Sequence, residues 1–286
     1  METMCGKECI RMRKICLGQS IQGASHKRTG KECQDFFKVD VQKEYIILAV
    51  ADGHGSKSCP YSRTGAISAT NVFHDVVKEY LKEYRGQLEN LTTFLHREGE
   101  VSFSKNIERA WQWKIRAIQE NNTKISSNTP KDINGKINWS AVYKMYGCTL
   151  LGMLITDEFI FSYQMGDGDI MCVDSNGVRT VIDGDHILGV ETHSLSGKNA
   201  WEKSVTSIVK NDILEHTPRL YFMSTDGLAN SYIDSNEFKK TCQDYYNLFI
   251  DHREKDIKCN LNKWLEETSE LGCGDDITLL MLYFEG

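Results

Sequence analysis

Apolar runs rich in β-branched and aromatic residues alternate along the chain with polar segments, and this pattern predicts β-strands. Eight such runs occur, at 45–51, 147–156, 159–165, 169–174, 178–182, 205–209, 219–225 and 277–284. Each has a length that suits one strand of a sheet. The pattern therefore predicts a core built largely from sheet.

The links between the four runs from 147 to 182 are very short. They are Asp157-Glu158, the Gly-Asp-Gly of 166–168, and Ser175-Asn176-Gly177, in which Asn-Gly is a strong hairpin signal. Parallel neighbours need a crossover of a dozen or more residues, so links of this length are expected to join antiparallel strands. The pattern predicts an antiparallel meander over 147–182.

Three parts of the chain carry apolar residues at the three- and four-residue spacing of an amphipathic helix. They are 64–84, 104–119, and a C-terminal stretch over 238–268 for which Ser235 is the expected N-cap. We interpret these apolar stripes as faces that pack on a core, rather than as parts of a cofactor site.

Three other segments lack a clear period and are expected to be variable loops beside a cleft. They are 86–103, 120–145 and 183–202. No internal repeat and no linker rich in Pro, Gly or Ser interrupts the sequence. Strand runs towards both ends, with helices between them, predict one α+β domain over 1–286, built on antiparallel sheets.

The composition is that of a globular protein, with 40% hydrophobic residues, 26% charged residues and a net charge of -6. No basic stripe with interleaved aromatic residues occurs, so nucleic acid is not an expected partner. The first residues lack the apolar region of a secretory signal, and no run approaches the ~20 apolar residues of a membrane span. The oligomeric state is left open.

Ten cysteines are scattered along the chain without any CxxC pair. Cys148 and Cys172 lie within strand-like runs, where free thiols pack as small hydrophobic groups. We therefore predict reduced cysteines and a cytoplasmic protein.

One pattern recurs along the chain: an apolar run next to Asp, with Gly beside the Asp. It occurs at Asp52-Gly53-His54-Gly55, Gly166-Asp167-Gly168-Asp169, Asp226-Gly227 and Gly274-Asp275-Asp276. One Asp-Gly pair is ordinary turn chemistry. Four of them, each beside a strand run, predict carboxylates gathered at one edge of a sheet.

Gathered carboxylates repel one another unless a cation lies among them. Mg²⁺ and Mn²⁺ prefer carboxylate, carbonyl and water ligands, whereas zinc sites favour Cys and His. The set therefore predicts a centre for Mg²⁺ or Mn²⁺. His54 follows one of the Asp-Gly pairs directly, which makes it a candidate general acid.

Six motifs stand in a fixed order along the chain. They are Gln34-Asp35, Asp52-Gly53-His54-Gly55, Gly147-Cys148-Thr149-Leu150-Leu151, Gly166-Asp167, Ser224-Thr225-Asp226-Gly227-Leu228 and Gly274-Asp275-Asp276-Ile277-Thr278. This series resembles that of the type 2C (PPM) protein phosphatases, from about residue 18 to the C-terminus. Segments 23–35 and 189–195 are similar to a bacterial branch of that family.

The resemblance implies a four-layer α-β-β-α sandwich, with two antiparallel sheets flanked by antiparallel helices. It also implies hydrolysis of phosphoserine and phosphothreonine in proteins by water activated at two Mn²⁺ or Mg²⁺ ions. The expected partner is a phosphorylated protein substrate, in opposition to a Ser/Thr kinase.

Residue roles carry over by position from the resemblance. Asp52 is expected to bridge both ions, and the Gly53 carbonyl to bind the second. Asp226 and Asp275 are expected to bind the first ion, and Asp35 to help order the second through water. His54 would protonate the departing Ser or Thr oxygen, and Asp167 matches the position of a third, weaker ion.

The phosphate contact is left open by the sequence. Many members of the family carry an Arg five residues before the Asp of the first motif, and this chain has Gly30 there. His26, Arg28 and Lys31 are the candidate replacements. The sequence does not choose among them.

Two alternatives accompany the phosphatase hypothesis. A non-catalytic domain that binds a phosphoprotein or a signalling partner is suggested by Gln34, where many members have Glu, and by the missing Arg. Hydrolysis of a small phosphate ester is a third possibility. The complete set of Asp ligands favours catalysis over binding alone.

Overall fold

The computed structural model describes residues 13–122, 129–182, 192–211 and 218–285. Within these ranges, ten strands form two five-stranded sheets, and all the neighbouring strands are antiparallel. The first sheet has the order β1 (Lys14–Ile21), β10 (Ile277–Phe284), β9 (Arg219–Ser224), β6 (Asp169–Asp174) and β7 (Gly177–Thr180). Its two central strands, β10 and β9, come from the last third of the chain.

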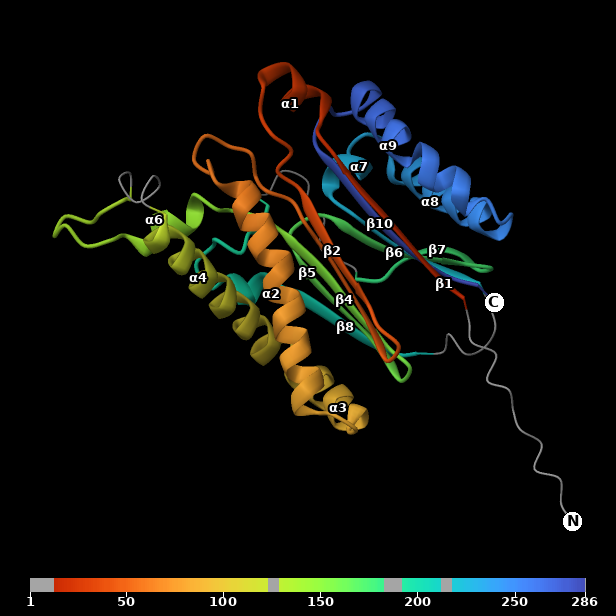
Figure 1. The fold of residues 1–286 in the computed structure, drawn as a ribbon, viewed down its shortest axis with the longest axis horizontal. Helices are drawn as coiled ribbons and strands as arrows, with labels where there is room; N and C mark the ends of the chain where they lie inside the picture. The colour runs from red at the N-terminus through yellow and green to blue at the C-terminus, as the bar shows by residue number, and fades with distance from the viewer. Residues whose placement is uncertain (1–12, 123–128, 183–191, 212–217, 286) are drawn as a thin grey trace, which may run out of the picture.

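The second sheet has the order β2 (Phe36–Val41), β3 (Tyr45–Ala51), β4 (Leu150–Thr156), β5 (Phe159–Met165) and β8 (Val205–Lys210). Helices α2 (Ser62–Glu83) and α4 (Ser104–Asn121) cover its outer face, and α8 (Ser235–Ile250) and α9 (Glu254–Leu271) cover that of the first sheet (Figure 1). The predicted α-β-β-α sandwich is confirmed.

Three apolar clusters hold the layers together. The inner one lies between the sheets and includes Ile46, Leu48 and Val50 of β3, opposite Leu280 and Leu282 of β10. All five side chains are fully buried, and each such burial stabilises the fold by roughly 1.5–3 kcal/mol. The other two clusters join each sheet to its helix pair. The inner cluster therefore fixes how the two sheets sit against each other.

The predicted meander over 147–182 is wrong at one link. β4 pairs with β5 and β6 pairs with β7, as expected for hairpins. The link 166–168, however, leads from β5 in the second sheet to β6 in the first. Packed sheets lie ~10 Å apart, a gap that three extended residues can span. The rule that short links join antiparallel neighbours applies only within one sheet, so Asp167 lies on a crossing between layers.

Segment 86–103 is helical rather than a loop, and this expectation is corrected. It contains α3 (Leu88–Glu98) and a π-helical turn, η1 (Gly99–Phe103). Leu91 and Leu95 are buried in the core beneath α2, and this burial stabilises the helix. α3 lies at the end of the second sheet opposite to the end where β3 leads into Asp52 (Figure 1). It therefore does not flank the site described below.

The other expected loops are partly ordered. Segment 120–145 includes α6 (Trp139–Lys144) and an isolated bridge between Lys131 and Ile137, and residues 123–128 lie outside the described ranges. In segment 183–202, residues 183–191 lie outside those ranges. The remainder forms turns and the 3₁₀ turn η2 (Ala200–Lys203).

The C-terminal helical stretch is divided in two. α8 ends at Ile250, and α9 begins at Glu254 after His252, whose positive φ of 54° breaks the helix. Asp234 caps α8 by accepting hydrogen bonds from the backbone N–H groups of Asn236 and Glu237. The prediction of Ser235 as N-cap is therefore wrong by one residue, because the carboxylate before it fills that role.

Two short helices complete the fold near the sheet ends that carry the Asp motifs. α1 (Ala24–Thr29) lies between β1 and β2, and α7 (Asp226–Ala229) follows β9. Cys148 and Cys172 are buried with apolar neighbours, as predicted. No helix among the described residues has the length and apolar character needed to cross a membrane.

Candidate active site

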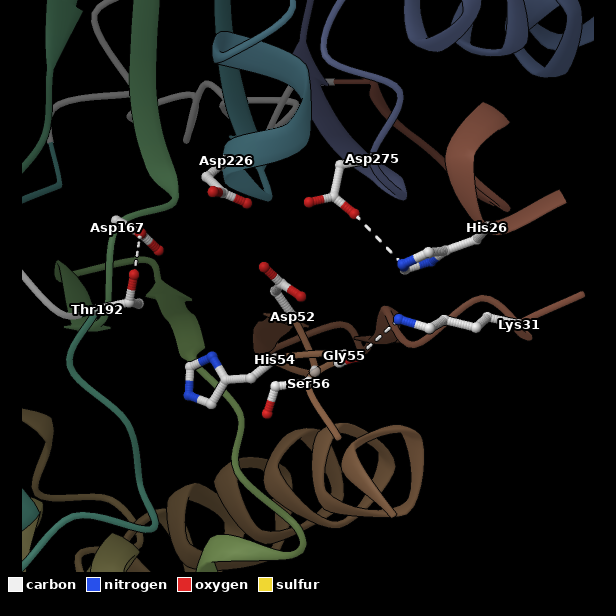
Figure 2. Close-up of a pocket in the computed structure, with 11 residues that line it drawn as sticks. His26, Lys31, Asp52, His54, Gly55, Ser56, Asp167, Thr192, Asp226 and Asp275 are labelled. Carbon is white, nitrogen blue, oxygen red and sulfur yellow. Dashed lines mark hydrogen bonds and ion pairs between the residues drawn. The ribbon is translucent and has the colours of Figure 1, made fainter. Parts of the chain in front are cut away.

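Carboxylates from both sheets converge on one pocket. Asp52 follows β3 of the second sheet, whereas Asp226 follows β9 and Asp275 precedes β10 of the first sheet. Together with Asp167, they line a pocket of ≈ 350 Å³, and their carboxylate groups face a common centre (Figure 2). The structure thus brings together side chains from four separate parts of the chain.

The segment that carries Asp52 extends the pairing of the second sheet beyond the end of β3. The Asp52 N–H donates to Thr149 Oγ1 at 3.0 Å, and the Thr149 N–H donates to the Asp52 carbonyl at 2.8 Å. Gly53 forms a bridge with Cys148, and the His54 N–H donates to the Gly147 carbonyl at 3.2 Å. Residues 147–149 therefore fix the backbone of 52–54.

Asp226 is positioned by the close packing of α7 against the start of β10. It is the first residue of α7, and its Oδ2 accepts a hydrogen bond from Asn230 Nδ2 at 2.9 Å. A Cβ atom on Gly227 would lie 2.1 Å from the Asp276 carbonyl oxygen. Only Gly allows this approach, which places Asp226 next to Asp275.

Asp35 lies behind Asp52 and does not line the pocket. It is 1% exposed, its Oδ2 accepts a hydrogen bond from Thr225 Oγ1 at 2.7 Å, and its Oδ1 has no partner. Burial, opposed in part by the Thr225 hydrogen bond, raises the pKa of Asp35 to about 8. A buried acceptor without a donor indicates that the structure leaves room for another ligand of this oxygen.

Two carboxylates that line the pocket, those of Asp52 and Asp226, also have raised pKa values. Burial, followed by the charges of Asp35 and Asp226, raises the pKa of Asp52 well above its usual range. Burial, followed by the charge of Asp167, raises the pKa of Asp226 to about 6. Oxygen donors that repel one another in this way fit a hard divalent cation, which would lower their pKa values again.

Asp167 is held by a hydrogen bond from the segment 183–202, which was expected to be a loop. Its Oδ2 accepts a hydrogen bond from Thr192 Oγ1 at 2.6 Å, and both residues line the pocket. Asp167 lies on the crossing between the two sheets, and Thr192 belongs to the segment 183–202. Of the three expected loops, this one reaches the site.

The basic candidates differ in where they lie. His26 and Lys31 line the pocket, and Lys31 Nζ donates to the Gly55 carbonyl at 3.0 Å. Arg28 lies on the exposed side of α1 and is not among the lining residues. His54 lines the pocket on the side opposite to His26, between Thr192 and Ser56 (Figure 2).

Comparison with known proteins identifies the family of the chain. The family described as protein phosphatase 2C matches residues 22–266. The chain belongs to the protein phosphatase 2C family. None of the curated protein sequences compared with the chain matches it.

Solved structures of low sequence identity share the protein phosphatase 2C fold with this chain. RsbX in complex with magnesium is 15% identical, with a TM-score of 0.52 over 96% of each chain. The catalytic domain of the serine/threonine phosphatase PstP with two manganese ions is 11% identical, with a TM-score of 0.56 over 96% of this chain and 100% of that one. PppA of Pseudomonas aeruginosa is 12% identical, with a TM-score of 0.53 over 95% and 97%.

Several supporting residues of this protein phosphatase 2C site were not predicted. Thr149 and Thr225 hydrogen bond to Asp52 and Asp35, and Thr225 Oγ1 also accepts from the Thr278 N–H at 2.9 Å. A signal was present for Thr225 and Thr278, since two of the six motifs contain a Thr within three residues of an Asp. Thr192 lies in the segment 189–195, whose similarity to a bacterial branch of the family did not assign the residue a role.

Proposed function

We propose that this protein phosphatase 2C member hydrolyses phosphoserine and phosphothreonine in proteins with the help of two Mn²⁺ or Mg²⁺ ions. The observation that carries the proposal is the convergence of Asp52, Asp226 and Asp275 on the pocket that His54 also lines. Asp52 and Asp226, whose pKa values are raised by burial and neighbouring charges, are poorly stabilised without a cation. The neighbours RsbX and PstP, crystallised with magnesium and manganese, support the choice of ion.

The chain supplies a ligand set for two ions. Asp52 is central in the pocket and is proposed to contact both, with the Gly53 carbonyl beside it. Asp226 and Asp275 would hold one ion, and Asp35 would support the other from behind Asp52. Ions held in this way supply a water of lowered pKa and neutralise charge on the phosphoryl oxygens. Asp167, held by Thr192, is proposed to take part in a third site.

The remaining pocket residues have roles that do not depend on binding metal. His54 is proposed to hold a proton on its imidazole and deliver it to the departing Ser or Thr oxygen, which is otherwise a strongly basic alkoxide. Lys31 is proposed to contact the phosphate, since its ammonium group reaches the pocket and is held by Gly55. Arg28 is not assigned to this role because it does not line the pocket.

The proposed substrate is a phosphorylated protein, and the proposed setting is cytoplasmic signalling in opposition to a Ser/Thr kinase. PstP is a serine/threonine phosphatase, and PppA is a regulatory component of a type VI secretion system in its bacterium. Both provide precedents on the same fold. Apart from the kinase that it would oppose, we assign no particular partner to this chain.

The test is hydrolysis of a phosphothreonine peptide with Mn²⁺, with Mg²⁺, and with excess chelator. We expect activity only with metal, and a loss of at least ~100-fold for Asp226→Asn, since even residues that support metal ligands cost 10–100-fold when changed. Asp244→Asn, on the exposed side of α8, is the matched control and should retain activity. Activity that persists with chelator and in Asp226→Asn would refute the metal mechanism, and higher kcat/KM on small phosphate esters would change the substrate class.

A further inference from the structure

His26 occupies a fixed place at the rim of the metal-binding pocket. It lies on α1, its side chain is 13% exposed, and its Nε2 lies 3.9 Å from Asp275 Oδ1. Figure 2 shows the imidazole pointing from α1 toward the space between Asp275 and Asp52. In the sequence, His26 is a candidate for the phosphate contact only. Its proximity to Asp275 is independent of the family resemblance.

The far side of the His26 ring rests against a buried carboxylate. His26 Nδ1 lies 2.9 Å from Asp276 Oδ1, in a direction that does not form a hydrogen bond. Asp276 itself is held in place, because its two oxygens accept the backbone N–H groups of Gly23 and Gln34, each at 2.7 Å. Asp276 is therefore fixed by the backbone and serves as a support for the ring.

The presence of a carboxylate beside the second ring nitrogen is a feature shared with metal-bound histidines, although His26 Nδ1 makes no hydrogen bond to it here. Such residues place their second ring nitrogen against a carboxylate or carbonyl, which fixes the ring and directs the other nitrogen to the ion. The carboxylate of Asp275 is exposed by 54% and faces the pocket. Asp276 lies behind the ring, whereas the Asp275 carboxylate and His26 Nε2 both lie on the pocket side and are available to bind an ion.

The separation of the two donors fits one shared ion. Two ligands at ~2.1 Å from a small divalent ion lie at most ~4.2 Å apart, and His26 Nε2 and Asp275 Oδ1 are 3.9 Å apart. We propose that His26 Nε2 is a ligand of the divalent ion held by Asp275. This inference rests on the proposed function, since it adds a nitrogen donor to a centre otherwise made of oxygen.

A phosphate contact is less well supported for His26 than for Lys31. His26 Nε2 lies 3.9 Å from the carboxylate of Asp275, which repels phosphate oxygens, whereas Lys31 Nζ is held by a neutral carbonyl. A nitrogen ligand also has a chemical consequence. Imidazole suits first-row transition ions better than Mg²⁺, which prefers oxygen. The chain would therefore favour Mn²⁺ over Mg²⁺ more than an all-oxygen centre does.

The test is pulsed electron paramagnetic resonance of the full chain loaded with Mn²⁺ alone. We expect an electron spin echo modulation from a directly bound ¹⁴N nucleus, which disappears in His26→Ala. His54→Ala is the matched control, because His54 lies across the pocket, and it should retain the signal. Calorimetry should show Mn²⁺ affinity reduced by ~10-fold or more in His26→Ala, with Mg²⁺ affinity changed by less than ~3-fold.

Two outcomes would overturn the proposal. One is Mn²⁺ bound to the wild type without any ¹⁴N modulation. The other is equal loss of Mn²⁺ and Mg²⁺ affinity in His26→Ala with the modulation retained. Both readouts are independent of catalysis, so a protein that binds Mn²⁺ through nitrogen but hydrolyses no phosphopeptide would refute the proposed function and leave this inference standing.

Discussion

The backbone N–H of Gln34 donates to Asp276 Oδ2 at 2.7 Å, which joins two residues 242 positions apart. The other oxygen of the same carboxylate accepts the N–H of Gly23. One buried side chain at the start of β10 therefore fixes both ends of the segment 23–34, which carries α1. The position of His26 and Lys31 at the pocket depends on this attachment.

Asp276→Ala is expected to lower the free energy of unfolding by ~2–4 kcal/mol, because two buried N–H groups lose their acceptor at ~1–3 kcal/mol each. Denaturant unfolding in the presence of chelator measures this. Asp275→Ala is the matched control, since that neighbour is 54% exposed and its loss removes repulsion within the pocket. Equal destabilisation by the two variants would contradict the role given to Asp276.

The metal-free protein is expected to become less stable as the pH rises from about 4 to about 8. The pKa of Asp35 is about 8 in the folded state against an ordinary value of 3.8, and that of Asp226 is about 6. These two carboxyls bind more protons in the folded protein than in the unfolded chain over this range, so their contribution to stability falls as the pH rises. His74, whose pKa is lowered to about 4, acts in the opposite direction up to about pH 6.5, and we expect the carboxyls to outweigh it. Urea unfolding in chelator at several pH values checks this.

Asp35→Asn tests the source of that pH dependence. An amide cannot ionise, so the variant should show a clearly smaller fall in unfolding free energy between about pH 5 and about pH 8. Saturating Mn²⁺ should also reverse the trend in the wild type, because an ion stabilises the charged carboxylates. An unchanged slope in Asp35→Asn would show that other groups cause the fall.

Lys31→Ala is expected to raise KM for a phosphopeptide by ~10-fold, which corresponds to ~1.4 kcal/mol, with kcat changed by less than ~3-fold. Inhibition by inorganic phosphate should weaken in parallel. Lys27→Ala is the control, since Lys27, four residues earlier on α1, has its Nζ 2.8 Å from Glu266 and does not line the pocket. If Lys31→Ala lowered kcat and left KM unchanged, the residue would not be a phosphate contact.

His54→Ala is expected to lower kcat on a phosphoserine peptide by ~100-fold or more, the range typical of a lost general acid. On p-nitrophenyl phosphate the loss should be under ~10-fold, because nitrophenolate leaves without needing a proton. Comparing the two substrates therefore separates acid catalysis from damage to the metal centre. Similar losses on both would argue for damage.

Gly65→Ala is expected to destabilise the fold by ~3 kcal/mol or more, because its Cβ would lie 1.8 Å from the Tyr146 carbonyl oxygen and backbone must move. Gly99→Ala is the contrasting change. Its Cβ would meet Phe161 and Thr206 at 3.5 Å, and its φ is helical at -58°. That variant should be neutral or stabilise by up to ~1 kcal/mol in thermal or denaturant unfolding.

Much of the fold follows from the hydrophobic pattern, and the exceptions have physical reasons. The bounds of β3, β5, β6 and β10 agree with the predicted runs. β1 and β2 were missed because their side chains are mostly half-buried, and such strands carry polar residues among the apolar ones. α3 was missed because segment 86–103 was interpreted as lacking a clear period, although Leu91 and Leu95 have the four-residue spacing of a helix face.

The candidate site was predictable in its Asp residues and not in their surroundings. Each of Asp52, Asp226 and Asp275 stands beside a strand, which was enough to place them at sheet ends. The burial of Asp35 and the fixing of Asp276 by the backbone depend on contacts between distant segments, which a local pattern does not encode. The three basic candidates were indistinguishable in sequence, and only the course of α1 separates Arg28 from His26 and Lys31.

The carboxylates of the site come from both sheets, so their relative positions depend on how the two sheets pack against each other. Asp52 belongs to one sheet and Asp226 and Asp275 to the other, and the side chains packed between those sheets set the gap. A larger or smaller residue at Leu48 or Leu280, remote from any reacting atom, would shift the carboxylate of one sheet relative to the two carboxylates of the other. If the protein acts as the proposed phosphatase, its catalytic rate is thus open to tuning by interior volume alone.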